Sequence, residues 1–247
     1  MNLTGKVALI TGASRGIGEG IAKKFAEFGA KIILVSQSGN NEEIVECIRQ
    51  IGSEVIAFKG DVTNKEEIDN IVSLGVEHFG QIDIVVNNAG VYKSKKFIDT
   101  TEEERDYQID VNIKGVWNVT QAVVPYFIEK KYGKIVMISS VSGYMVADKG
   151  QSAYAMSKSA IIGFTKALAV ELAEYNITVN AICPGHVLTK MSKGDIDKIA
   201  QQIPLGRYGK PEEVGELAAF LASDSSKYIT GTQGVFDGGS TLPETII

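Results

Sequence analysis

Seven short runs rich in valine and isoleucine recur along the chain, and longer segments with helical character lie between them. The runs are Lys6–Thr11, Lys31–Ser36, Glu54–Lys59, Ile82–Asn87, Lys134–Ser140, Ile177–Ile182 and Gln233–Asp237. Runs of this length and composition are typical of strands buried on both faces. The helical segments are Gly16–Phe28, Asn41–Ile51, Lys65–Phe79, Glu102–Lys130, Ser152–Tyr175 and Pro211–Ala222. This alternation of strand and helix predicts a mainly parallel sheet with helices on both faces.

The apolar positions within the helical segments support this arrangement. Ile17, Ile21 and Phe25 repeat at a spacing of four, which gives one helix an apolar stripe to lay on a sheet. Because ligands of such sheets gather at the carboxyl ends of the strands, we expect the site there. No internal repeat, low-complexity tract or linker divides the chain, and the five prolines mark single corners. One domain over residues 1–247 is therefore predicted.

Composition and charge exclude several classes of partner. The 247 residues are 44% hydrophobic, which is enough for a sizeable core, and the net charge is −5. Because there is no basic surplus, we expect neither nucleic acid nor an anionic membrane as a partner. The longest uncharged stretch, Tyr175–Thr189, contains Asn176, Asn180 and Pro184 and cannot span a bilayer. The first strand begins at Lys6, so we expect no signal peptide.

The cysteines and histidines are few and scattered. Cys47 and Cys183 are far apart and belong to no CxxC pair, which fits a reducing cytoplasm. The two histidines, His78 and His186, are too few for a His-rich site, so no metal is predicted.

A glycine-rich loop, Thr11–Gly18, follows the first strand and opens a helix. Gly12 permits the tight turn, Gly16 lets the backbone approach a pyrophosphate, and Gly18 allows close helix–strand contact. The free N–H groups of the helix then face the anion, with Ser14, Arg15 and Ile17 beside it. The spacing is GxxxGxG rather than GxGxxG, and a turn followed by a helix cap would also explain the glycines.

The end of the second strand bears on the choice of dinucleotide. An acid at this position usually binds the ribose hydroxyls of NAD, whereas here the residues are Ser36 and Gln37, and no acid occurs before Glu42. Arg15 is suited to pair with a 2′-phosphate. We therefore predict NADP(H) in preference to NAD(H), with NAD(H) as the alternative and a solvated Arg15 as the competing interpretation.

Tyr154 and Lys158 lie four residues apart in a helical segment, so their side chains share a face. Two further pairs have the same spacing, and the spacing alone proves little. Tyr154 is distinguished by Ser140, which ends the fifth strand before a loop leads to the helix. The other pairs, which have no such serine upstream, are Tyr92 with Lys96 and Tyr126 with Lys130.

These three residues suit carbonyl reduction. A carbonyl that receives hydride needs a proton donor and a group that holds its growing oxyanion. Tyr154 is expected to donate the proton, with its pKa lowered by the Lys158 ammonium, and Ser140 to hold the carbonyl oxygen. An ordinary exposed helix face is the competing interpretation of the pair.

Taken together, these motifs resemble the short-chain dehydrogenase/reductase family. They are Thr11–Gly18, Asn87–Gly90, Asn112, Ser140 and Tyr154-x-x-x-Lys158, and Pro184–Gly185 with Thr189 extends the likeness. The resemblance extends from Lys6 to about Gly239. The resemblance implies one Rossmann-type doubly wound domain with a seven-stranded parallel sheet flanked by helices, a nicotinamide dinucleotide, and usually a homotetramer.

The resemblance also implies roles for single residues. Asn112 would interrupt its helix and hold a water that links Lys158 to solvent, and Lys158 would also bind the nicotinamide ribose. Asp61 and Val62 match the adenine contacts. The remaining matches are Asn88, Ala89 and Gly90 on the adenosine ribose side and Pro184, Gly185, Val187 and Thr189 beside the nicotinamide ring. A strand-ending turn would also explain Asn87–Gly90.

Within the family, two segments resemble the UcpA group of oxidoreductases, and 3-oxoacyl-[acyl-carrier-protein] reductases are wider relatives. The segments are Met145–Asp148 and the ending Thr230–Gln233 with Asp237–Thr245. The expected reaction is hydride transfer between NADP(H) and a ketone or secondary alcohol, with a 3-oxoacyl thioester among the candidate substrates. The alternatives are an NAD-dependent alcohol or polyol dehydrogenase and a non-catalytic dinucleotide-binding sensor.

The substrate is less well specified. Residues 190–203 match the segment where this family builds its lid, and here the segment is short and polar. Gln151 and His186 are expected to face the substrate with Ser140 and Tyr154, although a lone histidine is more often structural.

The segment Ser152–Tyr175 is apolar on more than one side, since Lys166 is the only charge between Ser159 and Val170. One face can cover the sheet, and the other needs a partner. We therefore expect a homo-oligomer with this helix at an interface, joined by the helix of Trp117 and by Ile246–Ile247.

Overall fold

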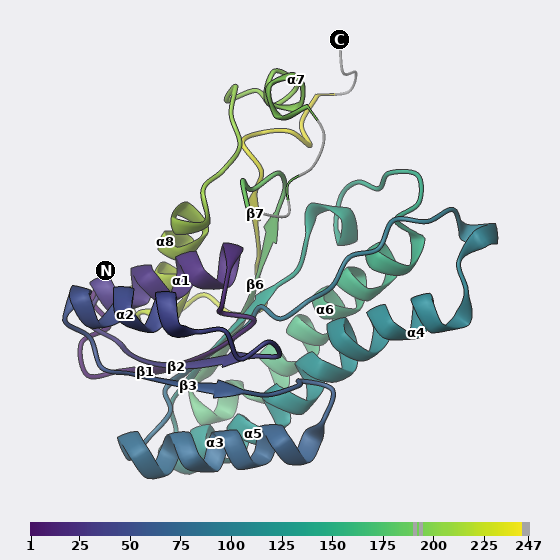
Figure 1. Ribbon diagram of the computed structural model, residues 1–247. Coiled ribbons are helices and arrows are strands. Elements are labelled where there is room, and N and C mark those ends of the chain that lie inside the picture. Colours follow the sequence, from purple (N-terminus) through teal and green to yellow (C-terminus); the bar gives the residue numbers. More distant parts are fainter. Residues whose placement is uncertain (190–191, 193–194, 244–247) are drawn as a thin grey trace.

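One parallel sheet of seven strands, in the order β3-β2-β1-β4-β5-β6-β7, runs through the computed structural model, which describes residues 1–189, 192 and 195–243 (Figure 1). The strands are β1 Val7–Thr11, β2 Lys31–Ser36, β3 Val55–Lys59, β4 Ile84–Asn87, β5 Gly133–Ile138, β6 Ile177–Pro184 and β7 Gln233–Phe236. The sequence predicted each of these strands within a few residues. The expected Rossmann-type doubly wound sheet is confirmed.

The helices cover both faces of the sheet. They are α1 Gly16–Glu27, α2 Glu42–Ile51, α3 Lys65–Phe79, α4 Glu102–Ile109, α5 Gly115–Lys130, α6 Ser152–Glu171, α7 Ile196–Ala200 and α8 Pro211–Ala222. One apolar core contains residues of α3, α5 and α6, and the other contains residues of α1, α2 and α8. Figure 1 shows α1 and α2 on the opposite side of the sheet from α3 and α5.

Strand β1 shows why the runs are continuously apolar. Alternate side chains of a strand point to opposite faces. Val7 and Leu9 therefore belong to the core beneath α3, α5 and α6, whereas Ala8 and Ile10 belong to the core beneath α1, α2 and α8. All four are at most 1% exposed. A strand covered on both faces therefore carries apolar side chains at most positions, and the polar Thr11 lies at its carboxyl end, where it bonds to the loop after β4.

The predicted helix Glu102–Lys130 is not continuous. A π-helical turn at Asp110–Lys114 separates α4 from α5. The turn contains Asn112, whose side chain is fully buried and bonds to the backbone of Val91 in the loop after β4. Single π-helical turns often mark functional sites, because they turn a side chain away from the regular helical direction. The interruption that the family resemblance implied at Asn112 is present.

Two smaller differences concern the ends of helices. Helix α6 ends at Glu171 and is followed by a 3₁₀ turn over Ala173–Tyr175, so the predicted segment Ser152–Tyr175 is two elements. Asn176 then adopts a left-handed φ of 58° and leads into β6. The short helix α7 lies in a segment that the sequence predicted only as a lid. None of the helices in residues 1–189, 192 and 195–243 is long and apolar enough to cross a membrane.

Candidate active site

A cavity of about 870 Å³ opens where β1, β2, β4, β5 and β6 end, at the edge predicted for the site. Many of the residues predicted for the site line it. They are Gly12, Ser14, Arg15, Gly16, Ile17, Ser36, Gln37, Asp61, Val62, Asn88, Ala89, Gly90, Ser140, Tyr154, Lys158, Pro184, Gly185 and Thr189. Five other candidates, Gly18, Asn112, Gln151, His186 and Val187, are outside its lining.

The glycine loop has the geometry of an anion cradle. Gly12 and Gly16 adopt left-handed φ angles of 65° and 61°, and a Cβ on Gly12 would lie 2.8 Å from the Cα of Ala89. Arg15 precedes α1 without a side-chain hydrogen bond to the first turn. The N–H groups of that turn therefore have no side-chain cap, and Gly16 and Ile17 of the turn line the cavity, which suits the binding of phosphate at a helix N-terminus.

Polar side chains join this loop to the end of β4. The hydroxyl of Thr11 accepts hydrogen bonds from the backbone N–H groups of Asn88 and Ala89, each at 3.1 Å. The amide of Asn88 donates to the carbonyl oxygens of Thr11 and Gly12 at 2.9 and 3.1 Å. Asn88 therefore both lines the cavity and fixes the loop, as the two interpretations of this segment allowed.

The end of β2 carries no acid, but three acids from neighbouring segments line the same cavity. Gln37 donates its amide to Asp61 at 2.8 Å. Burial alone would raise the pKa of Asp61, but hydrogen bonds from Thr63 and Gln37 outweigh it and hold this pKa below its usual range. Glu42 and Glu43, at the start of α2, line the same cavity as Arg15, which the sequence pattern did not indicate.

Ser140 and Tyr154 meet on the opposite wall of the cavity. Ser140 follows β5 and accepts a hydrogen bond from the N–H of Ser142 at 3.1 Å. Its hydroxyl is close enough to the Tyr154 phenol to lower the pKa of that phenol in part. The buried Lys158 lies one turn further along α6, with its Nζ 5.8 Å from the centre of the Tyr154 ring. The structure thus brings the three residues together.

The ionisation of this pair differs from the sequence expectation. Burial raises the pKa of the Tyr154 phenol, and the hydrogen bond with Ser140 lowers it only in part. Burial also lowers the pKa of the Lys158 ammonium to about 8. The ammonium group of Lys158 donates to the carbonyl oxygen of Ile138 at 2.9 Å, and the pKa of the Tyr154 phenol stays above its usual value.

Asn112 connects the loop after β4 to helix α6. Its Oδ1 accepts from the N–H of Val91 at 2.8 Å, and its Nδ2 donates to the carbonyl of Val91 at 2.9 Å. The same Nδ2 donates to the hydroxyl of Ser157 at 3.0 Å, and Ser157 donates to the carbonyl of Tyr154 at 2.7 Å. Asn112 thus reaches the backbone of Tyr154 through one serine. Sequence reasoning missed Ser157, although it directly precedes Lys158.

The segment after β6 closes the cavity near the glycine loop. Gly185 donates its N–H to Phe236 at 2.9 Å, and a Cβ on Gly16 would lie 3.3 Å from Thr189. Val187 is buried and forms a bridge with Gly209, which accounts for its absence from the lining. The cradle, the uncapped helix and a cavity of this size fit the dinucleotide that the resemblance implies.

The residues predicted to face the substrate lie less directly in the cavity. The Gln151 amide lies 3.4 Å from the hydroxyl of Tyr92, which lines the cavity. His186 is exposed, and its ring packs against Tyr208 at 5.6 Å. Part of the predicted lid, residues 190, 191, 193 and 194, lies outside the described residues. The rest includes α7, whose first turn is capped by Asp195.

The other two tyrosine–lysine pairs are differently placed. Tyr92 and Lys96 lie in a loop without helical structure, so the spacing of four has no geometric meaning there. Tyr126 and Lys130 do share helix α5, but Lys130 is paired with Asp83. Neither lysine lines the cavity.

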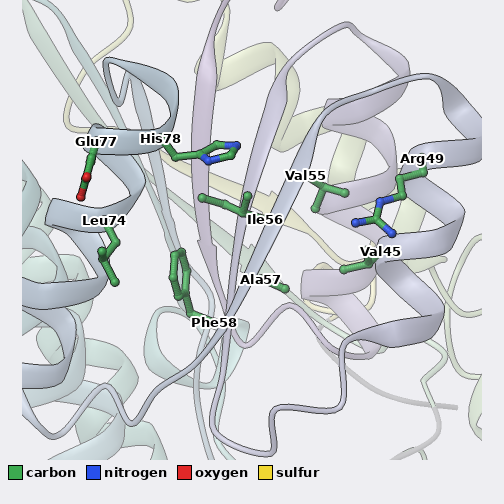
Figure 2. Close-up of a pocket in the computed structure, with 9 residues that line it drawn as sticks. All are labelled: Val45, Arg49, Val55, Ile56, Ala57, Phe58, Leu74, Glu77 and His78. Atoms are coloured by element: carbon green, nitrogen blue, oxygen red, sulfur yellow. The ribbon is translucent and has the colours of Figure 1, made fainter.

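A second groove, of about 820 Å³, lies along the outer edge of the sheet. Figure 2 shows it across β3, with Arg49 of α2 on one side and Glu77 and His78 of α3 on the other. None of the residues predicted for the site lines it, so it is separate from the site. Within residues 1–189, 192 and 195–243, no group of three His, Cys, Asp or Glu side chains is placed to hold a metal ion.

Known proteins resemble this chain along its whole length. A family model described as Enoyl-(Acyl carrier protein) reductase matches residues 12–241. Oxidoreductase UcpA of Salmonella typhimurium is 54% identical over 256 residues, covering 99% of this chain and 97% of that protein. The 3-oxoacyl-[acyl-carrier-protein] reductase FabG of Thermotoga maritima is 44% identical, covering 98% and 100%. A short-chain type dehydrogenase/reductase structure from Mycobacterium marinum has a TM-score of 0.93 at 35% identity, covering 98% of each chain.

These likenesses agree with the motifs and with the sheet. They extend over the glycine loop, the Ser140 strand and the Tyr154 helix, and they confirm the resemblance to the UcpA and 3-oxoacyl reductase groups. The chain belongs to the short-chain dehydrogenase/reductase family of oxidoreductases.

Proposed function

We propose that this oxidoreductase interconverts a ketone and a secondary alcohol with NADP(H), and that Ser140, Tyr154 and Lys158 carry the chemistry. The observation that supports this most is that Ser140 and Tyr154 both line the cavity that also contains the glycine loop, with the Ser140 hydroxyl close enough to influence the pKa of the phenol. A buried lysine lies beside them. A carbonyl oxygen placed between the serine and the tyrosine would meet two hydroxyl groups.

The roles follow from what the transition state requires. When bound, the dinucleotide supplies the hydride, so negative charge grows on the carbonyl oxygen. Ser140 donates a hydrogen bond to that oxygen, and Tyr154 donates the proton that completes the alcohol. The Lys158 ammonium then favours the tyrosinate that remains. Asn112 fixes the turn of α6 that carries Tyr154 relative to the loop after β4, through hydrogen bonds with Ser157 and Val91.

The preference for NADP(H) is proposed from charge. Arg15 lines the cavity near Ser36 and Gln37, and its guanidinium suits a 2′-phosphate. Glu42 and Glu43 line the same cavity and favour the second candidate, an NAD-dependent alcohol dehydrogenase. Comparing kcat/KM for NADPH and NADH distinguishes the two. A higher value with NADPH supports our proposal, and equal values or a preference for NADH contradict it.

Among the substrates to be tested, 3-oxoacyl thioesters deserve inclusion because relatives at 40–44% identity are named 3-oxoacyl-[acyl-carrier-protein] reductases. The panel should also contain simple ketones, sugars and alcohols. Oxidation of the reduced dinucleotide, followed by absorbance, reports turnover of any carbonyl compound. No turnover with any member of the panel would count against the proposed reaction.

The roles are tested by replacing Tyr154 with phenylalanine. Tyr154→Phe removes the proton donor but keeps the ring, so turnover should fall by about 10²- to 10⁴-fold while dinucleotide affinity stays nearly unchanged. Tyr126→Phe is the matched control, because Tyr126 and Lys130 have the same spacing on α5. Wild-type turnover in Tyr154→Phe would show that another group donates the proton.

We also propose a homotetramer with α6 at an interface. Val170 of this helix is 82% exposed and Met156 is 49% exposed. Trp117 of α5, 53% exposed, stacks on Phe164 of α6 at 5.3 Å and extends the same apolar surface. A second copy of the helix would cover it. The predicted contribution of Ile246–Ile247 lies outside the described residues.

A cytoplasmic location is proposed from the cysteines. Cys47 and Cys183 are both unpaired in the structure, which suits a reducing compartment. Cell fractionation with an antibody to the protein tests this, and recovery in an oxidising compartment would contradict it.

A further inference from the structure

Tyr92 lies against the proton donor of the proposed reaction. Its ring centre is 4.9 Å from that of Tyr154, and the two rings are inclined by 75°. This edge-to-face geometry is one that aromatic pairs prefer. Tyr92 also lines the cavity and is 44% exposed, so part of its ring remains available to a ligand.

Buried amides fix the backbone on both sides of Tyr92. Asn112 makes two hydrogen bonds to the backbone of Val91. Gln108, which is 1% exposed, accepts a hydrogen bond from the N–H of Lys93 at 3.1 Å. A loop held in this way presents its middle side chain in one position, and a recognition residue benefits from such preorganisation.

The far end of the Tyr92 side chain also has a partner. Its hydroxyl lies 3.4 Å from the Gln151 amide, just before α6 begins. The loop that carries it is joined to the segment before α6 by a hydrogen bond from the N–H of Lys95 to the carbonyl of Gly150 at 2.9 Å. Tyr92 is thus supported by the segment that directly precedes Tyr154 in the chain.

The neighbouring part of the lining is apolar and aromatic. Val91, Tyr107 and Val111 come from the same loop and from the helical segment that follows it, and all three line the cavity. Tyr107 is 41% exposed, so this wall offers a second ring surface. A planar apolar group would find favourable contacts with these rings.

We propose that Tyr92 is a specificity-determining residue that selects ketones whose carbonyl carries an aromatic or conjugated ring. The inference rests on the proposed function, because a carbonyl at Ser140 and Tyr154 places its substituent beside Tyr92. The ring of the substrate packs on the Tyr92 ring while the carbonyl oxygen reaches the two hydroxyls. Tyr92 takes no part in proton transfer.

The test compares acetophenone with 2-octanone, two methyl ketones with eight carbon atoms each. We expect Tyr92→Leu to lower the ratio of their kcat/KM values about three- to tenfold, chiefly through a higher KM for acetophenone, because one aromatic contact is lost. Tyr92→Phe keeps the ring and should leave the ratio within about twofold. Tyr228→Leu is the control, since Tyr228 is fully exposed and outside the cavity lining.

The outcomes separate the two proposals. If wild-type protein turns over no member of the wider carbonyl panel, the proposed function fails. If it turns over ketones but Tyr92→Leu leaves the ratio unchanged, or lowers both values equally, the inference about Tyr92 is wrong and the proposed function stands. Where neither methyl ketone reacts, their dissociation constants for the dinucleotide-saturated protein, measured by calorimetry, replace kcat/KM in the same comparison.

Discussion

Replacing Lys158 by methionine should remove activity and yet stabilise the folded protein at neutral pH. The reason is that Lys158 is 4% exposed and donates to the carbonyl oxygen of Ile138 without a carboxylate partner among the hydrogen bonds and ion pairs of the described residues. Methionine has a similar length and no charge. A residue retained for chemistry at the expense of stability behaves in this way.

The magnitude follows from the pKa. Burial lowers the pKa of Lys158 from 10.5 to about 8, which corresponds to about 3 kcal/mol of folding free energy at neutral pH. Loss of the hydrogen bond to Ile138 costs about 1 kcal/mol. Lys158→Met should therefore be more stable than wild type by about 2 kcal/mol at pH 7.

The pH dependence has a definite sign. Below pH 8 the lysine is charged in both the folded and unfolded states, so the folded protein bears the full free-energy cost of burying the ammonium group. Between pH 8 and 10.5 the unfolded chain binds more protons than the folded one, so wild-type stability rises with pH. The advantage of Lys158→Met should accordingly shrink to near zero by pH 10.

The test is denaturant unfolding followed by circular dichroism, without dinucleotide and at one protein concentration. It measures the difference in unfolding free energy between Lys158→Met and wild type at pH 7 and at pH 10. Lys166→Met, at an exposed position of the same helix, is the control. It measures the change in stability caused by losing a lysine charge that is not buried. If Lys158→Met is less stable than wild type at both pH values by the same amount, the reasoning about burial is refuted.

The remaining predictions concern the site and the interface. Ser140→Ala should lower kcat/KM for a ketone about 100-fold with an unchanged dinucleotide dissociation constant, and a change below twofold would remove Ser140 from the mechanism. Gly18→Ala should destabilise the fold by about 1–3 kcal/mol in denaturant titrations, because the new Cβ would lie 2.4 Å from the carbonyl oxygen of Gly12, and wild-type stability would contradict this. Arg15→Gln should reduce the preference for NADPH over NADH about tenfold in steady-state kinetics, whereas an unchanged preference would mean that Arg15 is only a solvated charge. Val170→Glu should lower the sedimenting mass of the oligomer at micromolar concentration, and a monomeric wild type would refute the interface.

The parallel sheet could be predicted because the five inner strands are covered on both faces and therefore read as nearly continuous apolar runs. The edge strands β3 and β7 are partly exposed, so the expectation of burial on both faces is wrong for these two. The glycine loop could be placed because Gly12 follows strand β1 and Gly16 opens helix α1. The π-helical turn at Asn112 left no such mark in the local pattern, because it depends on Val91, twenty-one residues away in the chain. The resemblance to a family, rather than periodicity, indicated that interruption.

The chemistry of the site was predicted less completely. The spacing placed Tyr154 and Lys158 on one face of a helix, which the structure confirms. It could not reveal that the ammonium group turns to Ile138, nor that burial outweighs the Ser140 hydrogen bond at the phenol. Tyr92 was passed over because its sequence neighbours suggest only a loop. Its importance comes from contacts with segments distant in the chain.

The position of the nicotinamide ring in a crystal structure with bound NADP⁺ tests the central claim most directly. Our account predicts that the ring lies beside Ser140 and Tyr154, with the pyrophosphate at the start of α1. A ring bound elsewhere, or a Tyr154 side chain directed away from it, would contradict the proposed chemistry even though the fold and the family would stand.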